Sequence, residues 1–411
     1  MNERENHAWT RSGLAGLLAA TLVPCAGPLV AGETIARTFA EGEVAIDLRY
    51  RFEGVDQDGF AEDAESSTLR LRLGYETGTY HGVFAGADFE AIVVVGDDGY
   101  DSTANGRTEF PVVPDPEGEE LNQAYLGYRG IKDTTTFKLG RQRIILDNAR
   151  FIGNVGWRQN EQTFDAFSIK SAIPGNVSLF AGHLNNANRI FGEDHPDPSR
   201  AELNLDADLL NISADFSVGK LTGYAYLIEQ EDIPAASHKN FGVRYTGKHE
   251  LGEKTVLRYT AEYADQSDYA DGADTVDADY GLAQIGVTTH GIGVQVGYEI
   301  LGGDGVYGFQ TPLATLHAFN GWTDRFLLTP DTGIRDLNLA VRGAFAGVKL
   351  LGVYHDFSAD SGGADHGSEY GVSVSRTFNK MWTAALKYAS YDSDTFSVDV
   401  DKLWITLQFK R

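Results

Sequence analysis

Residues 44–52 read VAIDLRYRF, and this stretch decides the fold because its apolar and charged residues alternate. Apolar side chains occupy the even positions, whereas Asp47, Arg49 and Arg51 occupy odd ones. Successive side chains of a β-strand point to opposite faces, so the stretch predicts a strand with one apolar and one charged face. Residues 69–76, LRLRLGYE, repeat the pattern and place Arg70 and Arg72 on the charged face.

The same alternation recurs along the chain and predicts 18 strands of a length that suits crossing a membrane. The predicted spans are 43–53, 67–77, 81–94, 121–130, 134–143, 162–172, 176–185, 208–217, 220–230, 239–248, 254–265, 278–289, 292–301, 334–344, 347–358, 368–377, 381–391 and 401–410. An even number of strands returns both chain ends to one side of a membrane. Sixteen strands is the alternative.

Connection lengths distinguish the possible architectures. Links after even-numbered strands are short, whereas links after odd-numbered strands are mostly long, as at 95–120, 144–161 and 302–333. Membrane barrels sort their loops in this way, with short periplasmic turns and long outer loops, and β-sandwiches and propellers have no reason to do so. The sequence therefore predicts an all-β fold, a transmembrane antiparallel β-barrel of about 18 strands.

The two ends of the chain fit an exported barrel. Residues 1–32 have the features of a signal peptide, with Arg4 and Arg11 before or at the start of an apolar core and small residues near Ala31, which leaves 33–411 as one barrel domain. The last strand ends on Phe409 and resembles the C-terminal signal read by the β-barrel assembly machinery, although Lys410 and Arg411 follow it. With a mean hydropathy of −0.26 and no run of 18 apolar residues after residue 32, a helical membrane protein is excluded.

Basic residues are concentrated between residues 121 and 170, where eight bases face four acids in a chain whose net charge is −25. Arg141 and Arg143 fall on the apolar parity of their strand, so either a bulge shifts the register or the strand has left the membrane. The following loop is predicted to fold into the lumen, with a simple external loop as the alternative. The residues predicted to line a solute path are Arg49, Arg51, Arg70, Arg72, Arg129, Lys138, Arg141, Arg143, Arg150 and Arg158.

Two roles are open to these cations. The guanidinium fork binds carboxylates bidentately, so an arginine-lined path could carry an anionic solute. Alternatively, the cations pair with lumen-facing acids and close the pore. The predicted lumen-facing acids are Asp47, Glu76, Asp88, Glu90, Asp215, Glu262 and Glu299.

The run RQRIILDNARFIGNVGWRQNEQTFDA, residues 141–166, resembles the alginate-export-type outer-membrane β-barrels of Gram-negative bacteria. The resemblance implies a monomeric barrel in the outer membrane, whose basic lumen guides an anionic polysaccharide or small organic anions. It also implies contact with outer-membrane lipid and lipopolysaccharide. The detailed match covers about 45 residues. The resemblance therefore supports the barrel architecture more strongly than it supports a particular solute.

Acidic loops oppose a polyanionic solute. Residues 265–279 hold six aspartates and no base, and residues 193–208 are similarly acidic. Such surfaces repel polyanions unless salt or divalent ions screen them. Solvation is their simplest role, and Ca²⁺ binding is the alternative; no other cofactor is predicted.

The sequence favours a channel and not an enzyme. Motifs of the GxSxG, HExxH, CxxC and Walker types are absent from it, and nothing in it indicates a nucleic-acid partner. Two alternatives remain: a plugged barrel with adhesive or metal-binding acidic loops, and an outer-membrane phospholipase. The second would use His366 and Ser368 with Asn379 from the next link.

Overall fold

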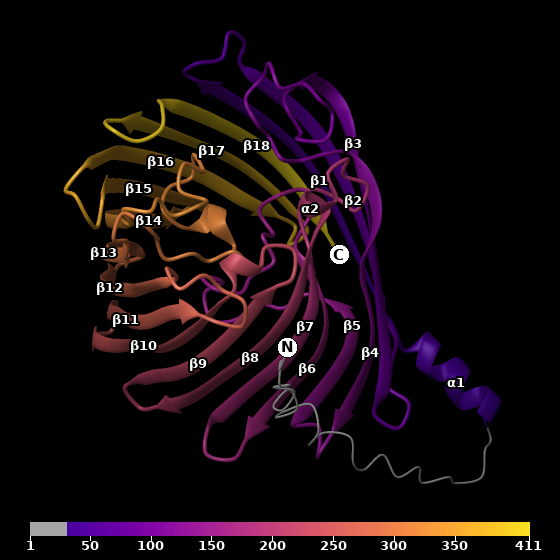
Figure 1. Cartoon of the computed structure of the whole chain (residues 1–411). Helices are drawn as coiled ribbons and strands as arrows, with labels where there is room; N and C mark the ends of the chain where they lie inside the picture. The colour runs from indigo at the N-terminus through magenta and orange to yellow at the C-terminus, as the bar shows by residue number, and fades with distance from the viewer. Residues whose placement is uncertain (1–30) are drawn as a thin grey trace, which may run out of the picture.

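A computed structural model describes residues 31–411, with side chains from residue 35 onward. The predicted signal peptide falls almost wholly on residues 1–30 and lies outside the described part of the chain. The described part begins with helix α1 (Ala31–Ala40), which the alternation analysis did not predict. This helix lies outside the barrel wall (Figure 1), and its Thr38 carbonyl accepts a hydrogen bond from Gly78 N at 2.9 Å.

Eighteen antiparallel strands form one closed sheet, as predicted (Figure 1). Each strand pairs with the next along the chain, and β1 closes the ring by pairing with β18 from Asp47↔Lys410 to Gln57↔Val400. The strands are β1 (Glu43–Gln57), β2 (Ala64–Glu76), β3 (Val83–Gly99), β4 (Gly118–Gly130), β5 (Thr135–Gln142), β6 (Thr163–Ile173), β7 (Val177–Asn188), β8 (Glu202–Phe216), β9 (Gly219–Gln230), β10 (His238–Gly252), β11 (Thr255–Asp268), β12 (Asp277–Thr289), β13 (Ile292–Leu301), β14 (Ile334–Phe345), β15 (Val348–Ser358), β16 (Asp365–Phe378), β17 (Trp382–Ser393) and β18 (Val400–Lys410). Short helices α2 (Pro198–Ala201), η1 (Pro234–Ala236) and η2 (Leu316–Ala318) lie in the connections.

The connections alternate between tight turns at one end of the barrel and longer loops at the other. His290–Gly291 and Ala346–Gly347 join their strands as two-residue turns in which both residues have positive φ angles, from 49° to 84°. Turns with two positive φ angles match the right-handed twist of the strands that they connect. The long connections include residues 143–162 and 302–333, which return in the site below.

The barrel exposes apolar side chains and buries charged ones. Ile285 and Val372 are 55% and 50% exposed on the outer face, whereas Arg51 and Glu53 on the inner face are 2% and 1% exposed. In water this arrangement would be unstable, but lipid solvates the outer face of a membrane barrel while polar groups line its interior. Separately, none of the described helices is long and apolar enough to span a membrane.

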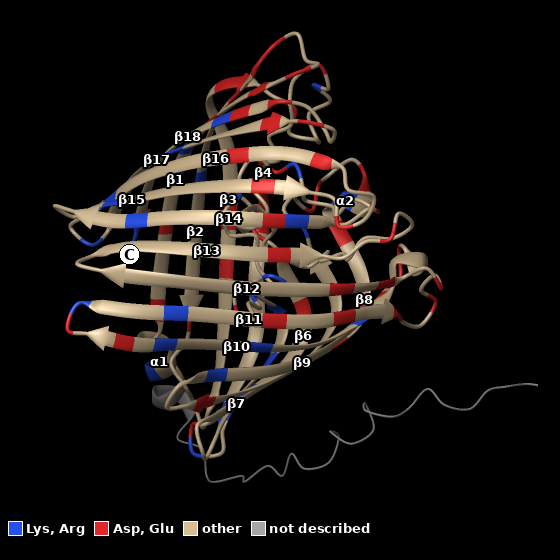
Figure 2. Cartoon of the chain, turned by 90° about the vertical axis from the view of Figure 1, so that its left-hand side faces the viewer, with Lys and Arg blue, Asp and Glu red and all other residues tan. Residues whose placement is uncertain are grey.

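Charge is sorted along the barrel axis. Figure 2 shows acidic residues gathered toward the long-loop end of the strands, whereas many of the basic residues on the strands lie nearer the short-turn end. The potential inside the barrel therefore changes from one end to the other.

A matched pair of substitutions on β12 tests which face touches lipid. Ile285→Arg should destabilise the barrel by about 2–4 kcal/mol, because it places a charge near the middle of the apolar belt. Gln284→Arg, on the neighbouring inward-facing position, should change stability by no more than about 1 kcal/mol. Urea unfolding in lipid vesicles, followed by tryptophan fluorescence, measures both, and equal losses would contradict the assignment of faces.

Candidate functional site

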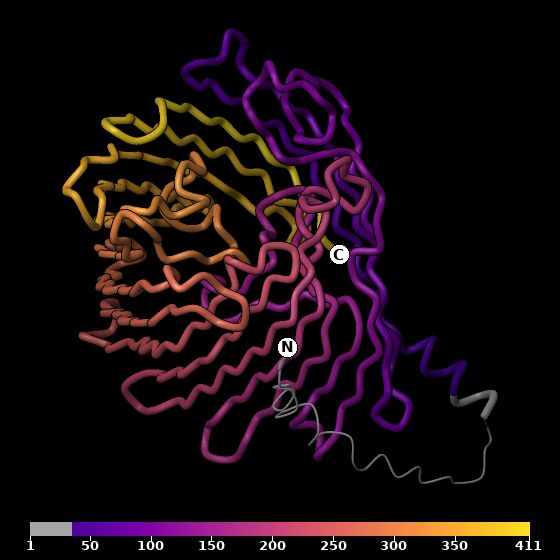
Figure 3. Tube along the Cα trace, viewed as in Figure 1, coloured from indigo at the N-terminus to yellow at the C-terminus, as the bar shows by residue number. Residues whose placement is uncertain are grey.

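Two loops fold into the barrel and bind each other there (Figure 3). The β5–β6 loop (143–162) and the β13–β14 loop (302–333) are joined by main-chain hydrogen bonds. Gly153 N donates to Leu313 O at 2.8 Å, and Thr315 N donates to Ala149 O at 2.9 Å. Residues far apart in the sequence thus form a single inner layer, and the prediction of an inward β5–β6 loop agrees with this arrangement.

Aromatic packing anchors this inner layer to one side of the wall. Phe151 lies 5.2 Å from Tyr224 and 5.4 Å from Tyr280, between ring centroids, and Phe309 of the second loop packs 5.9 Å away. All four side chains are buried, together with Ile152. The β9–β12 side of the interior is therefore filled, and four inward arginines lie on the opposite side, which includes β1 and β2.

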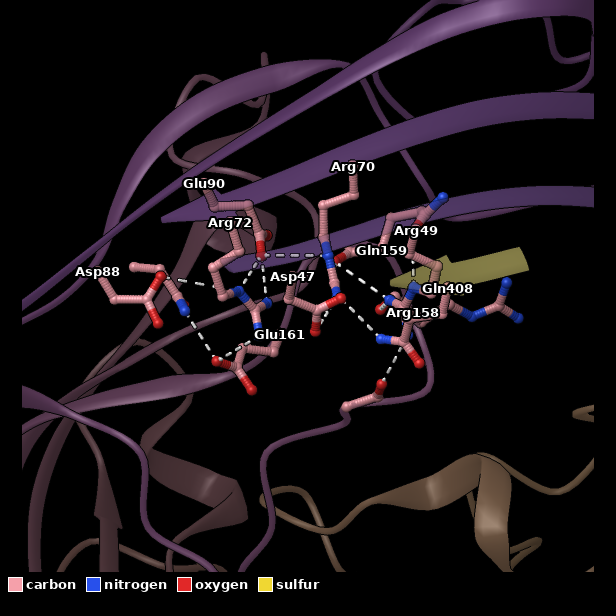
Figure 4. Close-up of polar contacts among 12 residues, drawn as sticks. Asp47, Arg49, Arg70, Arg72, Asp88, Glu90, Arg158, Gln159, Glu161 and Gln408 are labelled. Atoms are coloured by element: carbon pink, nitrogen blue, oxygen red, sulfur yellow. Dashed lines mark hydrogen bonds and ion pairs between the residues drawn. The ribbon is translucent and has the colours of Figure 1, made fainter. Parts of the chain in front are cut away.

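Four arginines project inward from β1 and β2 and form what we call the arginine ladder: Arg49, Arg51, Arg70 and Arg72. Arg49 and Arg70 are direct cross-strand partners, a placement that destabilises a sheet when the charges are not balanced. Gln159 of the β5–β6 loop lies between them (Figure 4): its Oε1 accepts from Arg49 Nε at 2.8 Å, and its main-chain oxygen accepts from Arg70 at 3.1 Å. Asp47 supplies a carboxylate to Arg70 at 2.7 Å.

Two members of the ladder are held without a carboxylate. Arg49 donates to Gln159 and to the main-chain oxygens of Gly156 and Arg158, and Arg51 donates to Trp157 O at 2.6 Å. Arg51 also stacks over the Trp157 ring at 4.1 Å. Within residues 31–411 neither guanidinium has an acidic oxygen within 4.0 Å, so their positive charge is solvated by dipoles and is not cancelled.

Glu161, at the end of the β5–β6 loop, is paired more strongly. It accepts hydrogen bonds from Arg143 and from Asn122 and Asn154, and its Oε1 lies 3.1 Å from Arg72. Burial alone would raise the pKa of Glu161, but the attraction of Arg72 and the bonds from Arg143 outweigh it and lower the pKa to about 2. This carboxylate fastens the loop to the ladder.

A second polar cluster joins both loops to the wall. Arg158 bridges Glu53 at 2.9 Å and Asp324 at 2.8 Å, and Asp324 also accepts from Lys402 at 3.0 Å. His317 Nδ1 lies 2.7 Å from the same Asp324 carboxylate. Burial alone would raise the pKa of Asp324, but His317, Lys402 and Arg158 together hold it well below its ordinary value.

Lys387 of β17 completes this cluster. Its ammonium lies 3.8 Å from the ring centroid of Trp322, 4.1 Å from that of Trp157 and 5.0 Å from that of Trp404. It donates to His317 Nε2 at 2.7 Å, which fixes His317 as a neutral imidazole that donates from Nδ1. Burial and the neighbouring ammonium hold the pKa of His317 well below its ordinary value.

A cavity of about 650 Å³ opens beside the ladder, toward the short-turn end of the barrel. Its lining side chains comprise six cations and three carboxylates, a formal side-chain balance of +3. The charged lining residues are Arg49, Arg70, Arg72, Arg143, Lys410 and Arg411, with Asp47, Asp88 and Glu161.

The structure brings six of the ten predicted path residues together: the four of the ladder, with Arg143 and Arg158. β5 ends at Gln142, so Arg143 is a loop residue and its strand parity does not apply. Arg150 lies on the other side of the inner layer, 2.8 Å from Glu299. It also bonds to Thr311 and Asn320.

The remaining three predicted residues lie apart from the ladder. Arg129 pairs with Glu76 at 2.9 Å and is 44% exposed. Lys138 lies 3.7 Å over the ring of Tyr125. Arg141 pairs with Asp165 at 3.0 Å, within the strand pair β5–β6.

The partners that give the ladder its geometry, above all Gln159, Asp324 and His317, were not predicted from the sequence. Loop residues have no strand parity, so the alternation pattern contains no signal for them. The tryptophan neighbours of Lys387 likewise come from three separate segments, which no local pattern connects.

The phospholipase alternative is wrong in its geometry. Ser368 lies near the long-loop end of β16, whereas Asn379 follows the other end of that strand, about 36 Å away at 3.3 Å per residue. His366 packs 5.0 Å from the ring of Phe396, and neither of its ring nitrogens has a hydrogen-bond partner in the described chain. Serine, histidine and asparagine therefore do not meet.

Comparison with solved structures shows the fold. OpdK of Pseudomonas aeruginosa, solved with vanillate, has a TM-score of 0.72 at 15% identity over 91% of this chain and 99% of that one. OccAB4 of Acinetobacter baumannii gives 0.68 at 16% identity over 90% and 98%. OccK9 (OpdG) of P. aeruginosa gives 0.71 at 15% over 91% and 100%.

A closed 18-strand barrel with a polar interior and inward loops is the fold of the porin-like outer-membrane barrels. Within that class, the family model described as alginate export matches residues 41–300. The chain belongs to that family, as the resemblance of residues 141–166 had implied. None of the curated proteins matches the chain.

Glu161→Gln tests how the β5–β6 loop is held. The pKa of Glu161 lies below its ordinary value of 4.5, so its carboxylate stabilises the fold above that pH and the contribution is lost as pH falls toward about 2. At pH 7 the variant should be less stable by on the order of 3 kcal/mol.

Unfolding by urea at several pH values measures this difference. The difference in free energy of unfolding between the native protein and the variant should disappear as the pH falls from about 4.5 to 2, the ordinary and the lowered pKa of Glu161. Glu62→Gln, in the exposed β1–β2 loop, makes the same chemical change and serves as the control. A gap that does not vary with pH would contradict the assignment.

Proposed function

We propose that the protein is a diffusion channel for small organic anions, with the arginine ladder and its cavity as the selective passage. The observation that carries the proposal is the cavity of about 650 Å³ with its excess of cations. Arg49 supports it further, because its charge faces this cavity without a carboxylate partner in the described chain. A carboxylate solute would find guanidinium donors there in the geometry that it binds best.

The likeness to OpdK supports a small solute. That protein was solved with vanillate, a single aromatic carboxylate, and it shares the fold of this chain. A polymer is less well supported, because the two inner loops are bonded to each other and to both sides of the wall. Transport of a polysaccharide would require Arg150, Arg158 and Glu161 to lose their partners together.

The sorting of charge fits an anion that meets the ladder near the short-turn end. In an outer-membrane barrel the short turns face the periplasm, so the cavity would open to that side. The acidic long-loop end would then face the exterior and repel polyanions, as the sequence suggested. At physiological salt this rim only weakly opposes the diffusion of small anions, because the field of its exposed charges decays over about 8 Å.

A second function has one observation in its favour. The region between the loops and the wall is filled by the Arg158–Asp324–Lys402 cluster and by Lys387 with its tryptophan neighbours. The charges of Arg158, Asp324 and Lys402 are buried and paired there. A barrel closed by this network would serve as a structural or adhesive surface protein.

Single-channel recording in a planar bilayer under a salt gradient distinguishes the two functions. The native protein should conduct ions, and the sign of its reversal potential should show that anions are more permeant than cations. Arg49→Gln should reduce the anion-to-cation permeability ratio roughly threefold to sevenfold, because one charge acts at about 7 Å through a partly aqueous path. Arg49→Lys keeps the charge and should retain most of the preference.

Arg376→Gln provides the matched control, since it removes the same charge from the strand end of β16, outside the lining of the cavity. It should leave the ratio unchanged. Cation preference in the native protein would overturn the anion assignment, and a complete lack of conductance would favour the closed barrel.

A further inference from the structure

A second, smaller cavity lies nearer the long-loop end, between the wall strands β3 and β4 and three loops. Glu90 and Glu120 contribute from the wall and Asn160 from the β5–β6 loop. Ala104 comes from the β3–β4 loop and Glu193 from the β7–β8 loop. Its volume is about 40 Å³, enough for roughly three water-sized particles.

The lining of this cavity is strongly acidic. Its carboxylates come from Glu90, Glu117, Glu119, Glu120, Glu193 and Asp194, and no lysine or arginine lines it. The charges that balance it come from residues outside the lining: Arg72 donates to Glu90 Oε2 at 2.6 Å, and Arg141 lies 3.7 Å from Glu193. Carboxylates that share a small space repel one another, so the arrangement favours a bound positive charge.

Two buried acceptor atoms at the cavity lack partners. Glu90 is 1% exposed, and its Oε2 accepts from Arg72 at 2.6 Å, but its Oε1 has no hydrogen bond within the described chain. Asn160 is 2% exposed, and its Oδ1 is likewise without a partner there. A buried acceptor that stays unsatisfied costs about 1–3 kcal/mol, and a cation would satisfy both oxygens at once.

The chemistry of the lining selects a hard cation. His195 supplies the one imidazole among the lining residues, and both of its nitrogens are occupied: Nε2 donates to Thr103 O at 2.9 Å, and Nδ1 accepts from Asp197 N at 3.0 Å. The groups left for a ligand are oxygens of carboxylates, an amide and the main chain. Oxygen ligands of this kind suit Ca²⁺ or Mg²⁺.

We propose that this cavity binds one hard divalent cation, Ca²⁺ or Mg²⁺, through Glu90, Asn160 and Glu120. No three His, Cys, Asp or Glu side chains between residues 35 and 411 are grouped closely enough to hold a bare metal ion, so the cation keeps part of its water shell. Glu193 lies on the exposed β7–β8 loop and also lines the cavity, where its charge attracts the ion without ligating it.

The bound cation joins segments that otherwise repel one another. It connects the wall, the β5–β6 loop and the acidic β7–β8 loop, which His195 already ties to the β3–β4 loop through Thr103. It also binds the free Oε1 of Glu90, whose Oε2 accepts from Arg72 of the arginine ladder. Divalent ions should therefore order the long-loop end of the barrel.

Isothermal titration of the purified, detergent-folded protein with CaCl₂ and, separately, MgCl₂ tests the proposal. One equivalent should bind, and the β3–β4 and β7–β8 loops should become resistant to protease at the same concentrations. Glu120→Gln should weaken binding at least about tenfold, which corresponds to 1.4 kcal/mol, because it removes one charged ligand. Asp271→Asn, in the acidic β11–β12 loop, makes an equal charge change elsewhere and should leave binding unchanged.

Heat-modifiable migration on gels shows whether each variant has folded, so that a lost barrel is not mistaken for a lost site. If Glu120→Gln fails this check, Glu193→Gln replaces it and should weaken binding in the same direction. The proposal is overturned if the native protein binds neither ion, if Asp271→Asn weakens binding as much as Glu120→Gln, or if methylammonium binds in place of the divalent ions.

Discussion

The pairing of β1 with β18 is the constraint on which the rest of the structure depends. Lipid offers no hydrogen bonds, so a sheet in a membrane must leave no edge unpaired. The eleven paired positions between Asp47 and Gln57 on one strand and Val400 and Lys410 on the other close the ring. Closure separates two environments, and every strand must then present an apolar face to lipid and a polar face to the interior.

Closure also places like charges next to each other on the inner wall, and the inner loops stabilise them. Alternation places Arg49 opposite Arg70 on the inner wall, where like charges repel. The β5–β6 loop reduces this repulsion, because its main-chain oxygens and the side chain of Gln159 accept hydrogen bonds from the arginines. Dipoles solvate a guanidinium without neutralising it, so the wall is stabilised and the charge is retained. Pairing every arginine with a carboxylate would have removed that charge.

The two cavities differ in sign and are joined by one ion pair, between Glu90 of the smaller cavity and Arg72 of the larger one. Glu90 faces Arg72 with one oxygen, and with the rest of its side chain it lines the smaller, acidic cavity. The larger cavity beside the ladder carries an excess of cations. The contrast follows the sorting of charge along the barrel, with acids toward the long loops and bases toward the turns (Figure 2). A solute that crosses the barrel would thus meet fields of opposite sign in sequence.

The sequence by itself determined the barrel and the parity of Arg49, Arg51, Arg70 and Arg72, and it predicted about 18 strands with 16 as the alternative. The physical reason is that alternate side chains of a strand face lipid and lumen, so apolar and polar residues alternate in the sequence with a period of two. The match of residues 141–166 to a family likewise needed only the order of residues. Helix α1 was missed because it lies outside the wall and follows no such alternation.

Only the tertiary structure decided what the charged residues contact. Gln159 lies 110 residues from Arg49 in the sequence, and Asp324 lies 166 from Arg158, so nothing local connects them. The same limit applies to Lys387, whose three tryptophans come from two loops and a neighbouring strand. Strand faces are set by the solvent on each side, whereas loop contacts are set by the space that a closed barrel leaves inside, and that space exists only after the chain has folded.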